Sequence, residues 1–304
     1  MSRKPARLEI RIGLAPAPED AFGPASVVPD PSERSRSARW APQRGAALDA
    51  FCAALADDTA YPVLTHDLAD YGDLIDAMHA SDVDIAWLPP VLALRATSRG
   101  RAIPIALPVR GGTAFYSTAL FTHPGSRIRD LTQLHGARAA WVDQQSAAGY
   151  LVIRASLRQR GIDLENLFAS ETFYGSHTAV GKAVLEGRAD VGASFVHLDP
   201  RRSRPRRSGW GDAQVRMLAT AGPIPNDMIA ATIRTPIDKI RAVQKALLQP
   251  SDELRAAASA LLGAEGFIEA NSEHLAPIQD LLDHLDDRAD LAPPSSHTPP
   301  GSRG

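Results

Sequence analysis

Segments typical of strands and of helices alternate along the first part of this 304-residue chain. Short apolar runs are separated by stretches whose apolar residues recur every three or four positions. The order is strand, helix, strand, helix, strand over residues 61–65, 70–78, 83–88, 90–97 and 102–109. Alternation of this kind favours a largely parallel sheet whose ligands bind at the carboxyl ends of the strands. The sequence therefore predicts an α/β fold.

Two later strand-to-helix turns carry the residues of a candidate anion site. In the first turn, the apolar run 137–142 precedes Ser146, a good N-cap for the helix that follows. Ser176 stands in the same position in the second turn. Free backbone N–H groups and the positive end of the helix dipole favour anions at such turns, and the small residues 147–149 let a ligand come close. For each serine, a plain capping role is the alternative.

The ordered set of segments resembles the PhnD-like family, the periplasmic phosphonate- and phosphite-binding proteins of ABC importers. The resemblance covers about residues 8–270 and is carried by residues 70–78, 83–87, 146–152, 175–177 and 223–227. It implies the two-lobed type 2 periplasmic-binding-protein fold, in which each lobe is a mostly parallel sheet flanked by helices. Two hinge crossovers would join a first lobe, residues 8–110 and 225–287, to a second lobe, residues 111–224.

The resemblance also implies which residues line the ligand cleft. Tyr71 and Asp227 match cleft residues of the family, although an aromatic plug at a helix end is the alternative for Tyr71. A cleft tyrosine near the start of the first crossover corresponds to Phe115 or Tyr116, depending on a one-residue shift. His177 either donates to a bound oxyanion or makes a structural hydrogen bond at a helix start. The predicted ligand-binding set is Tyr71, Tyr116, Ser146, Ala147, Ser176, His177 and Asp227.

One departure from the family bears on the ligand. Aminoalkylphosphonate binders carry a carboxylate that pairs with the ligand amine, and Val196 or His197 falls at that place in this chain. Since a buried ammonium without a partner is costly, we expect phosphate, phosphite or another small oxyanion rather than an aminoalkylphosphonate. If this segment aligns differently, Asp199 is the alternative partner.

Charge and motif content narrow the class of function. A net charge of -2 argues against a dedicated nucleic-acid protein, and the arginine run 201–207 is interpreted as a solvated loop. Phosphate-loop, nucleophile-elbow and metal-ligand motifs are missing, so we expect no cofactor and a ligand-capturing protein. The alternative is an enzyme on the same fold, similar to thiamine-precursor synthases and acting on a small phosphorylated metabolite. Its candidate reactive residues would be His66, His177 and Cys52.

The start of the chain bears on the cellular compartment, and two polar segments are predicted to lack packed structure. Residues 1–7 are basic, but the apolar stretch of a signal peptide does not follow, and no run is long enough to cross a membrane. We therefore favour a cytoplasmic sensor; in the periplasm, after removal of a leader, the protein would serve an ABC transporter permease. Residues 15–43 are predicted to form a long, disordered loop, with a lid as the alternative, and residues 288–304 a disordered tail.

Overall fold

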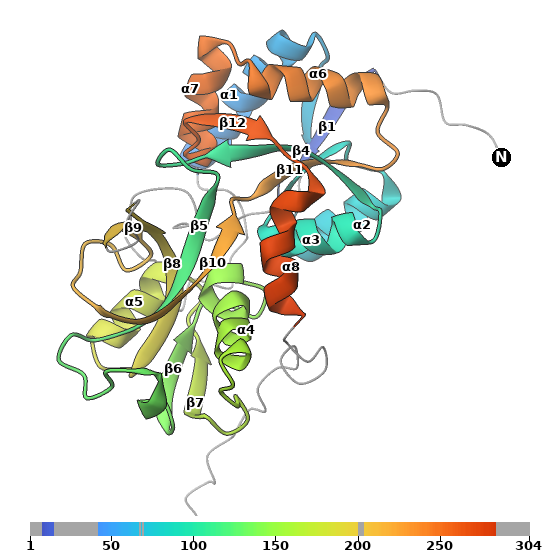
Figure 1. Ribbon diagram of the computed structural model, residues 1–304. Helices are drawn as coiled ribbons and strands as arrows, with labels where there is room; N and C mark the ends of the chain where they lie inside the picture. The colour runs from blue at the N-terminus through green and yellow to red at the C-terminus, as the bar shows by residue number, and fades with distance from the viewer. Residues whose placement is uncertain (1–7, 15–41, 67, 69, 200–203, 284–304) are drawn as a thin grey trace, which may run out of the picture.

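The chain forms two lobes, each built on a six-stranded sheet, in a computed structural model that describes residues 8–14, 42–66, 68, 70–199 and 204–283 (Figure 1). The predictions for residues 1–7, for the 288–304 tail and for all but the end of the 15–43 loop fall outside the described residues. Residues 201–203 of the arginine run lie outside them too. Within the described part of the chain, no helix has both the length and the apolar character that a membrane crossing needs.

The first lobe has a sheet in the order β12-β4-β11-β3-β1-β2. Strands β1 to β4 run in one direction, and β11 and β12 pair antiparallel with them. The predicted alternation is therefore confirmed, and two strands from the end of the chain complete the sheet. The strands are β1 (Ile10–Gly13), β2 (Val63–His66), β3 (Ile85–Leu88), β4 (Ala102–Val109), β11 (Met228–Thr232) and β12 (Gly266–Glu269).

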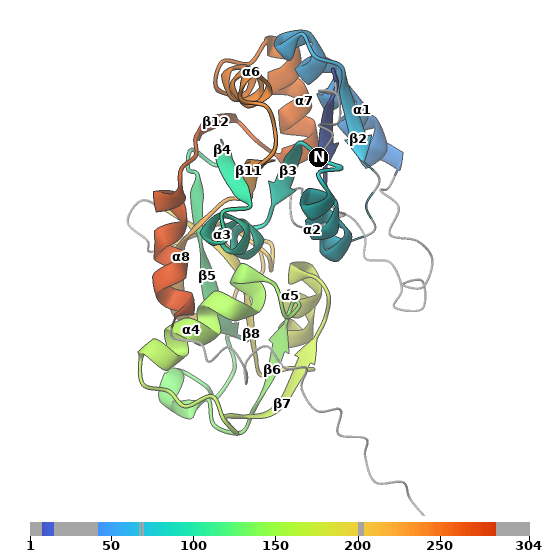
Figure 2. The ribbon, with the colours of Figure 1, turned by 90° about the vertical axis from the view of Figure 1, so that its right-hand side faces the viewer.

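Helices cover both faces of this sheet (Figure 2). Every residue of β3 is buried, as expected for a strand between two helical layers. Ile85 and Trp87 pack into the core with α1 (Pro42–Thr59), α6 (Ile237–Leu248) and α7 (Asp252–Leu262). Ala86 and Leu88 belong to a second core, which they share with α2 (Tyr71–Ala80) and α3 (Pro90–Ser98).

The second lobe has a sheet in the order β10-β5-β8-β6-β7, with β9 paired to β8. Strands β6, β7, β8 and β10 share one direction, whereas β5 and β9 run antiparallel to their neighbours. Its elements are β5 (Phe115–Thr122), β6 (Ala137–Trp141), α4 (Val152–Gln159), β7 (Phe168–Phe173), α5 (His177–Leu185), β8 (Val191–Leu198), β9 (Pro205–Ser208) and β10 (Arg216–Pro225).

The last helix differs from its expected place. We assigned the C-terminal residues up to 287 to the first lobe, yet α8 (Ala276–Leu282) packs against α4 and β10 of the second lobe (Figure 1). Its Ile278 is fully buried in one hydrophobic cluster with Val152 and Leu157 of that lobe. This helix directly follows the short 3-10 turn Ser272–Leu275. The chain therefore passes from the first lobe to the second at this turn.

Both predicted crossovers between the lobes are present, in addition to the passage of the chain to α8. One runs from β4 to β5 and the other from β10 to β11, and Asn226 holds them side by side. The Asn226 amide donates to the carbonyl of Pro108 at 2.8 Å and to that of Thr113 at 3.2 Å. Because the two crossovers are fixed together, residues from both can face a single space between the lobes.

Candidate ligand-binding site

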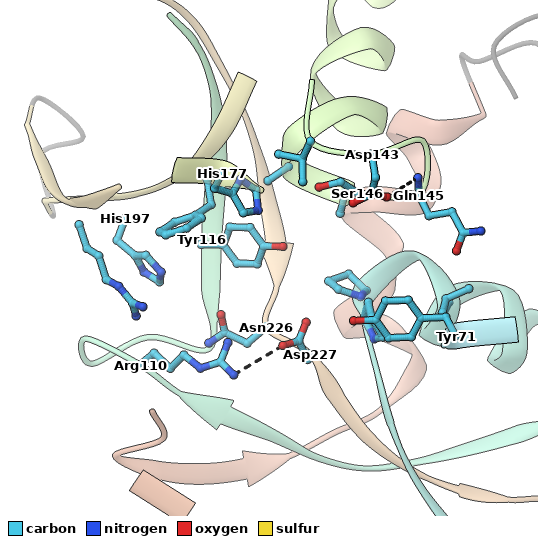
Figure 3. A pocket seen from close by; sticks show the side chains of 18 residues that line it. Tyr71, Arg110, Tyr116, Asp143, Gln145, Ser146, His177, His197, Asn226 and Asp227 are labelled. Carbon is cyan, nitrogen blue, oxygen red and sulfur yellow. Dashed lines mark hydrogen bonds and ion pairs between the residues drawn. The ribbon is translucent and has the colours of Figure 1, made fainter. Parts of the chain in front are cut away.

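A cavity of about 120 Å³ lies between the lobes and receives residues from both crossovers and from both strand-to-helix turns. Most of the predicted ligand-binding residues line it, and Figure 3 shows their side chains converging there. Those that line it are Tyr71, Tyr116, Ser146, Ala147, His177 and Asp227. Ser176 is not among the lining residues.

The first turn brings Ser146 and two small residues, Ala147 and Ala148, to the cavity. The Ser146 hydroxyl accepts a hydrogen bond from the Gly149 N–H at 3.0 Å, which confirms the predicted cap. A Cβ on Gly149 would lie 2.3 Å from Cγ2 of Val142, so only glycine fits this close contact. The helix opens with a π-helical turn, Ala147–Leu151, instead of the expected α-helical one. Ala147 lines the cavity, and the first N–H groups of a helix lack intrahelical partners.

The second turn uses its two polar residues differently. The Ser176 hydroxyl accepts from the Ala179 N–H at 3.1 Å. Ser176 therefore has the plain capping role that the sequence left as the alternative. His177, the first residue of α5, lines the cavity. Its Nδ1 lies 2.9 Å from the Ser194 hydroxyl. His177 therefore makes the structural hydrogen bond of one alternative and also lines the cavity, while its donation to an oxyanion stays a prediction.

The hinge contributes an ion pair that sequence reasoning missed. Nη2 of Arg110 lies 3.5 Å from Oδ2 of Asp227, and Nε of Arg110 donates to the Leu262 carbonyl at 2.9 Å. Burial raises the pKa of Asp227, although the Arg110 guanidinium opposes that shift. Burial likewise lowers the pKa of Arg110. The sequence feature that could have identified Arg110 is its position as a charged residue directly after an apolar strand, where the chain changes lobes.

Two tyrosines from different lobes face the cavity. Tyr71 is the first residue of α2, a helix capped by Asp70, whose carboxylate accepts from the Asp73 N–H at 3.0 Å. Tyr116 comes from β5, and burial, reinforced by the Asp227 carboxylate, raises the pKa of its phenol. The structure also resolves the one-residue ambiguity, because Phe115 stacks on His274 at 5.9 Å outside the cavity lining.

The β8–β9 hairpin forms a further wall. Strand alternation places Phe195 and His197 in the cavity lining, whereas Val196 is fully buried in the core of the second lobe. Of the two residues that the resemblance places at the family carboxylate, His197 is therefore the one that lines the cavity. Burial, together with Arg207 and Arg110, lowers the pKa of His197 to about 4.

Arg207 corrects the interpretation of the arginine run. It stands directly opposite His197 in the antiparallel β8–β9 pair, and opposite residues of such a pair share a face. Arg207 consequently lines the cavity, with its guanidinium 5.6 Å from the centre of the Phe195 ring. The interpretation of the whole run as a solvated loop is therefore wrong for Arg207, whereas Arg206 is exposed.

The other candidate residues from the sequence lie outside the cavity lining. Cys52 is buried in the core under α1, and this burial raises the pKa of its thiol to about 11. His66 ends β2 and is not a cavity residue. Asp199 accepts from the Arg204 N–H at 3.2 Å in the β8–β9 turn, also outside the cavity. Over the described ranges, histidine, cysteine and carboxylate side chains form no cluster that could hold a metal ion.

Two lobes of α/β type, two crossovers and a polar cavity between them define the class of two-lobed solute-binding proteins. Residues 39–275 match the family model described as ABC transporter, phosphonate, periplasmic substrate-binding protein. The chain belongs to this family. The family consists of substrate-binding proteins of ABC transporters, so the binding-protein interpretation holds over the enzyme alternative.

Individual relatives agree with this assignment. The chain is 25% identical over 175 residues to the phosphate-import protein PhnD of Mycolicibacterium smegmatis, a match covering 54% of this chain and 53% of that protein. The chain thus spans about half the length of this curated relative. Among solved structures, XAC2383 of Xanthomonas citri, bound to ATP, has a TM-score of 0.69 at 18% identity, covering 91% of this chain and 97% of that one.

PhnD1 of Prochlorococcus marinus, solved in complex with methylphosphonate, has a TM-score of 0.63 at 15% identity. That match covers 91% of this chain and 99% of the other. At these levels of identity the two solved structures show the shared fold.

Proposed function

We propose that the chain captures a small phosphorus oxyanion, namely phosphate, phosphite or a phosphonate, between its lobes and delivers it to the permease of an ABC transporter. The observation that carries the proposal is that both strand-to-helix turns open on one cavity, through Ser146 and Ala147 in the first and His177 in the second. A tetrahedral anion presents several oxygens and can accept from both turns at once.

The remaining cavity residues suit such an anion. A phenol whose pKa is raised, like that of Tyr116, stays protonated and keeps its O–H as a donor. Tyr71 brings a second phenol from the opposite lobe. Asp227 can accept a hydrogen bond from a protonated phosphorus oxygen, a group that phosphate and phosphonates carry near neutral pH. This role would favour partly protonated phosphorus oxyanions over fully ionised acids such as acetate.

The relatives support the same class of ligand. The Prochlorococcus marinus protein was solved with methylphosphonate, and the Mycolicibacterium smegmatis protein is named for phosphate import. Methylphosphonate and phosphate are therefore the first ligands to titrate.

A pair of Ser146 variants tests the proposal. Asp and Asn are both good N-caps of nearly equal size and differ in charge. Ser146→Asn should therefore keep the fold and bind methylphosphonate within several-fold of wild type. Ser146→Asp should keep the fold but place a carboxylate at the anion site, where repulsion of about 4 kcal/mol at 4 Å is the scale for a partly buried pair. Isothermal titration calorimetry measures both affinities.

We expect Ser146→Asp to bind at least about a hundredfold more weakly than Ser146→Asn, with both thermal melts close to that of wild type. Equal affinities for the two variants would overturn the assignment of the first turn. If phosphate, phosphite and methylphosphonate all fail to bind wild type, the proposed ligand class is wrong.

A further inference from the structure

The hairpin wall of the cavity holds a cation, Arg207, that forms no ion pair with a carboxylate of the described residues. Arg207 is half-buried and lies against the face of the Phe195 ring. Burial alone lowers the pKa of Arg207, and no ion pair joins it to a carboxylate in the part of the chain that the structure describes. Arg110, by contrast, is paired with Asp227. A partly desolvated guanidinium facing a cavity is suited to an anion that arrives with the ligand.

His197 also makes the hairpin wall suited to an anion. It lies opposite Arg207 in the hairpin, and its ring is 5.9 Å from that of Tyr116. Burial keeps the imidazole neutral near pH 7, so it offers one N–H donor or one acceptor. An ammonium group at this wall would meet the positive charge of Arg207, whereas a carboxylate would meet a guanidinium and a neutral imidazole.

Of the two carboxylates that line the cavity, Asp227 is paired with Arg110 at the hinge, and Asp143 belongs to the first turn. Asp143 accepts from the Gln145 N–H at 2.8 Å in the first turn. Figure 3 shows Asp143 beside Ser146, across the cavity from His197. The hairpin at His197 and the first turn at Ser146 therefore lie on opposite sides of the cavity, whereas the start of α5 adjoins the hairpin, with the His177 ring 4.9 Å from the Phe195 ring.

The cavity is also larger than bare phosphate requires. One water needs about 10–15 Å³ of comparable volume, so about 120 Å³ accommodates roughly eight to twelve water-sized groups. Phosphate has five non-hydrogen atoms. The space that remains can hold a short substituent that carries a second functional group.

We propose that His197 and Arg207 form a second anion subsite, so that the ligand is a phosphorus oxyanion that also carries a carboxylate. The chemical class is a phosphonocarboxylate or a phosphorylated carboxylic acid. This inference rests on the proposed function, because the phosphorus group must occupy the turns for the carboxylate to reach the hairpin.

Phosphonoacetate and 3-phosphonopropionate, each compared with its own carboxamide, test the inference. The amide matches the acid in shape and lacks its charge. Wild type should bind at least one of the two acids at least tenfold more tightly than the matching amide. In Arg207→Gln, that ratio should fall to near one, and affinity for the acid should fall by a larger factor than affinity for methylphosphonate. Isothermal titration calorimetry supplies all the affinities.

Arg206→Gln is the matched control, because Arg206 precedes Arg207 on the same strand and is exposed. This variant should keep the full preference for the acid. The inference is overturned if neither acid outbinds its amide in wild type, or if Arg207→Gln weakens methylphosphonate as much as it weakens the acids. In both cases binding of methylphosphonate to wild type would still support the proposed function. If wild type binds neither methylphosphonate nor either of the two acids, both proposals are rejected.

Discussion

Two of the buried cation–carboxylate pairs among the described residues have similar geometry, one inside the first lobe and one at the hinge. In the first lobe, Nζ of Lys239 lies 3.4 Å from Oδ2 of Asp84. At the hinge, the corresponding distance between Arg110 and Asp227 is 3.5 Å. The Asp84 and Asp227 side chains are each 16% exposed, and both cations are almost fully buried.

The pairs differ in what surrounds them. Asp84 also accepts from the Arg11 N–H at 3.0 Å, and Lys239 also donates to the Glu9 carbonyl. Partners within the first lobe therefore satisfy this pair, and neither member lines the cavity. Arg110 and Asp227 both line it. Burial and distance do not distinguish a structural pair from a site pair, but the position of the cavity does.

Removing the cation from each pair should separate stability from binding. Lys239→Met leaves Asp84 buried without its cation and should lower the free energy of unfolding by about 3–5 kcal/mol. Methylphosphonate affinity should be unchanged, because Lys239 is not a cavity residue. Arg110→Met should also destabilise and should weaken methylphosphonate at least tenfold. Denaturant unfolding and calorimetry measure the two effects. Equal losses of affinity in both variants would remove the distinction between the pairs.

Adding a carboxylate beside the hinge pair should change ligand preference. Wild type offers only Asp227 among the residues matched to the family to hold an amine, so it should favour phosphate over 2-aminoethylphosphonate by about a hundredfold. His197→Glu should shift that ratio towards the amine. Val196→Glu would instead bury a carboxylate in the core and should destabilise the second lobe. A competition titration in which wild type takes both ligands equally would contradict the role assigned to His197.

The carboxyl group of Asp227 should make the folding stability of the apoprotein depend on pH. The variant Asp227→Asn should lack this dependence. The pKa of Asp227 is higher in the folded protein than its ordinary value of 3.8. Between these two pKa values the folded state holds a proton that the unfolded chain has released, so stability falls as the pH rises through this range. Asp227→Asn has no such proton. Wild type should therefore lose stability relative to Asp227→Asn as the pH rises above 3.8.

Denaturant midpoints of the two proteins measured across this range test the expectation. The difference between them should stop changing once the pH exceeds the folded-state pKa of Asp227. A difference that moves in the opposite direction would show that the Arg110 guanidinium outweighs burial and lowers this pKa.

Most of the fold followed from local pattern. Apolar periodicity placed strands and helices close to their observed positions, and α6 spans the predicted Ile237–Leu248. Cap chemistry placed Ser146 correctly, because a serine before a helical pattern acts within one turn. Edge strands β9 and β12 were missed, since their short sequences carry little apolar alternation.

The missed parts of the site depend on pairing between distant segments. Arg207 enters the cavity only because β9 pairs with β8 in the register that sets it opposite His197. Nothing in an arginine-rich segment reveals which arginine faces inward. Arg110 becomes a site residue because a second crossover, far along the chain, brings Asp227 beside it. The choice between Val196 and His197 likewise required the orientation of β8, which a single strand cannot show.

A crystal structure of the complex with methylphosphonate would show whether a phosphorus oxyanion sits between the two helix N-termini. We predict that oxygens of the phosphonate lie within hydrogen-bond distance of the Ala147 N–H and of the α5 start at His177, at 2.7–3.2 Å for N–H donors. Phosphonate density elsewhere in the protein, with both turns empty, would contradict it.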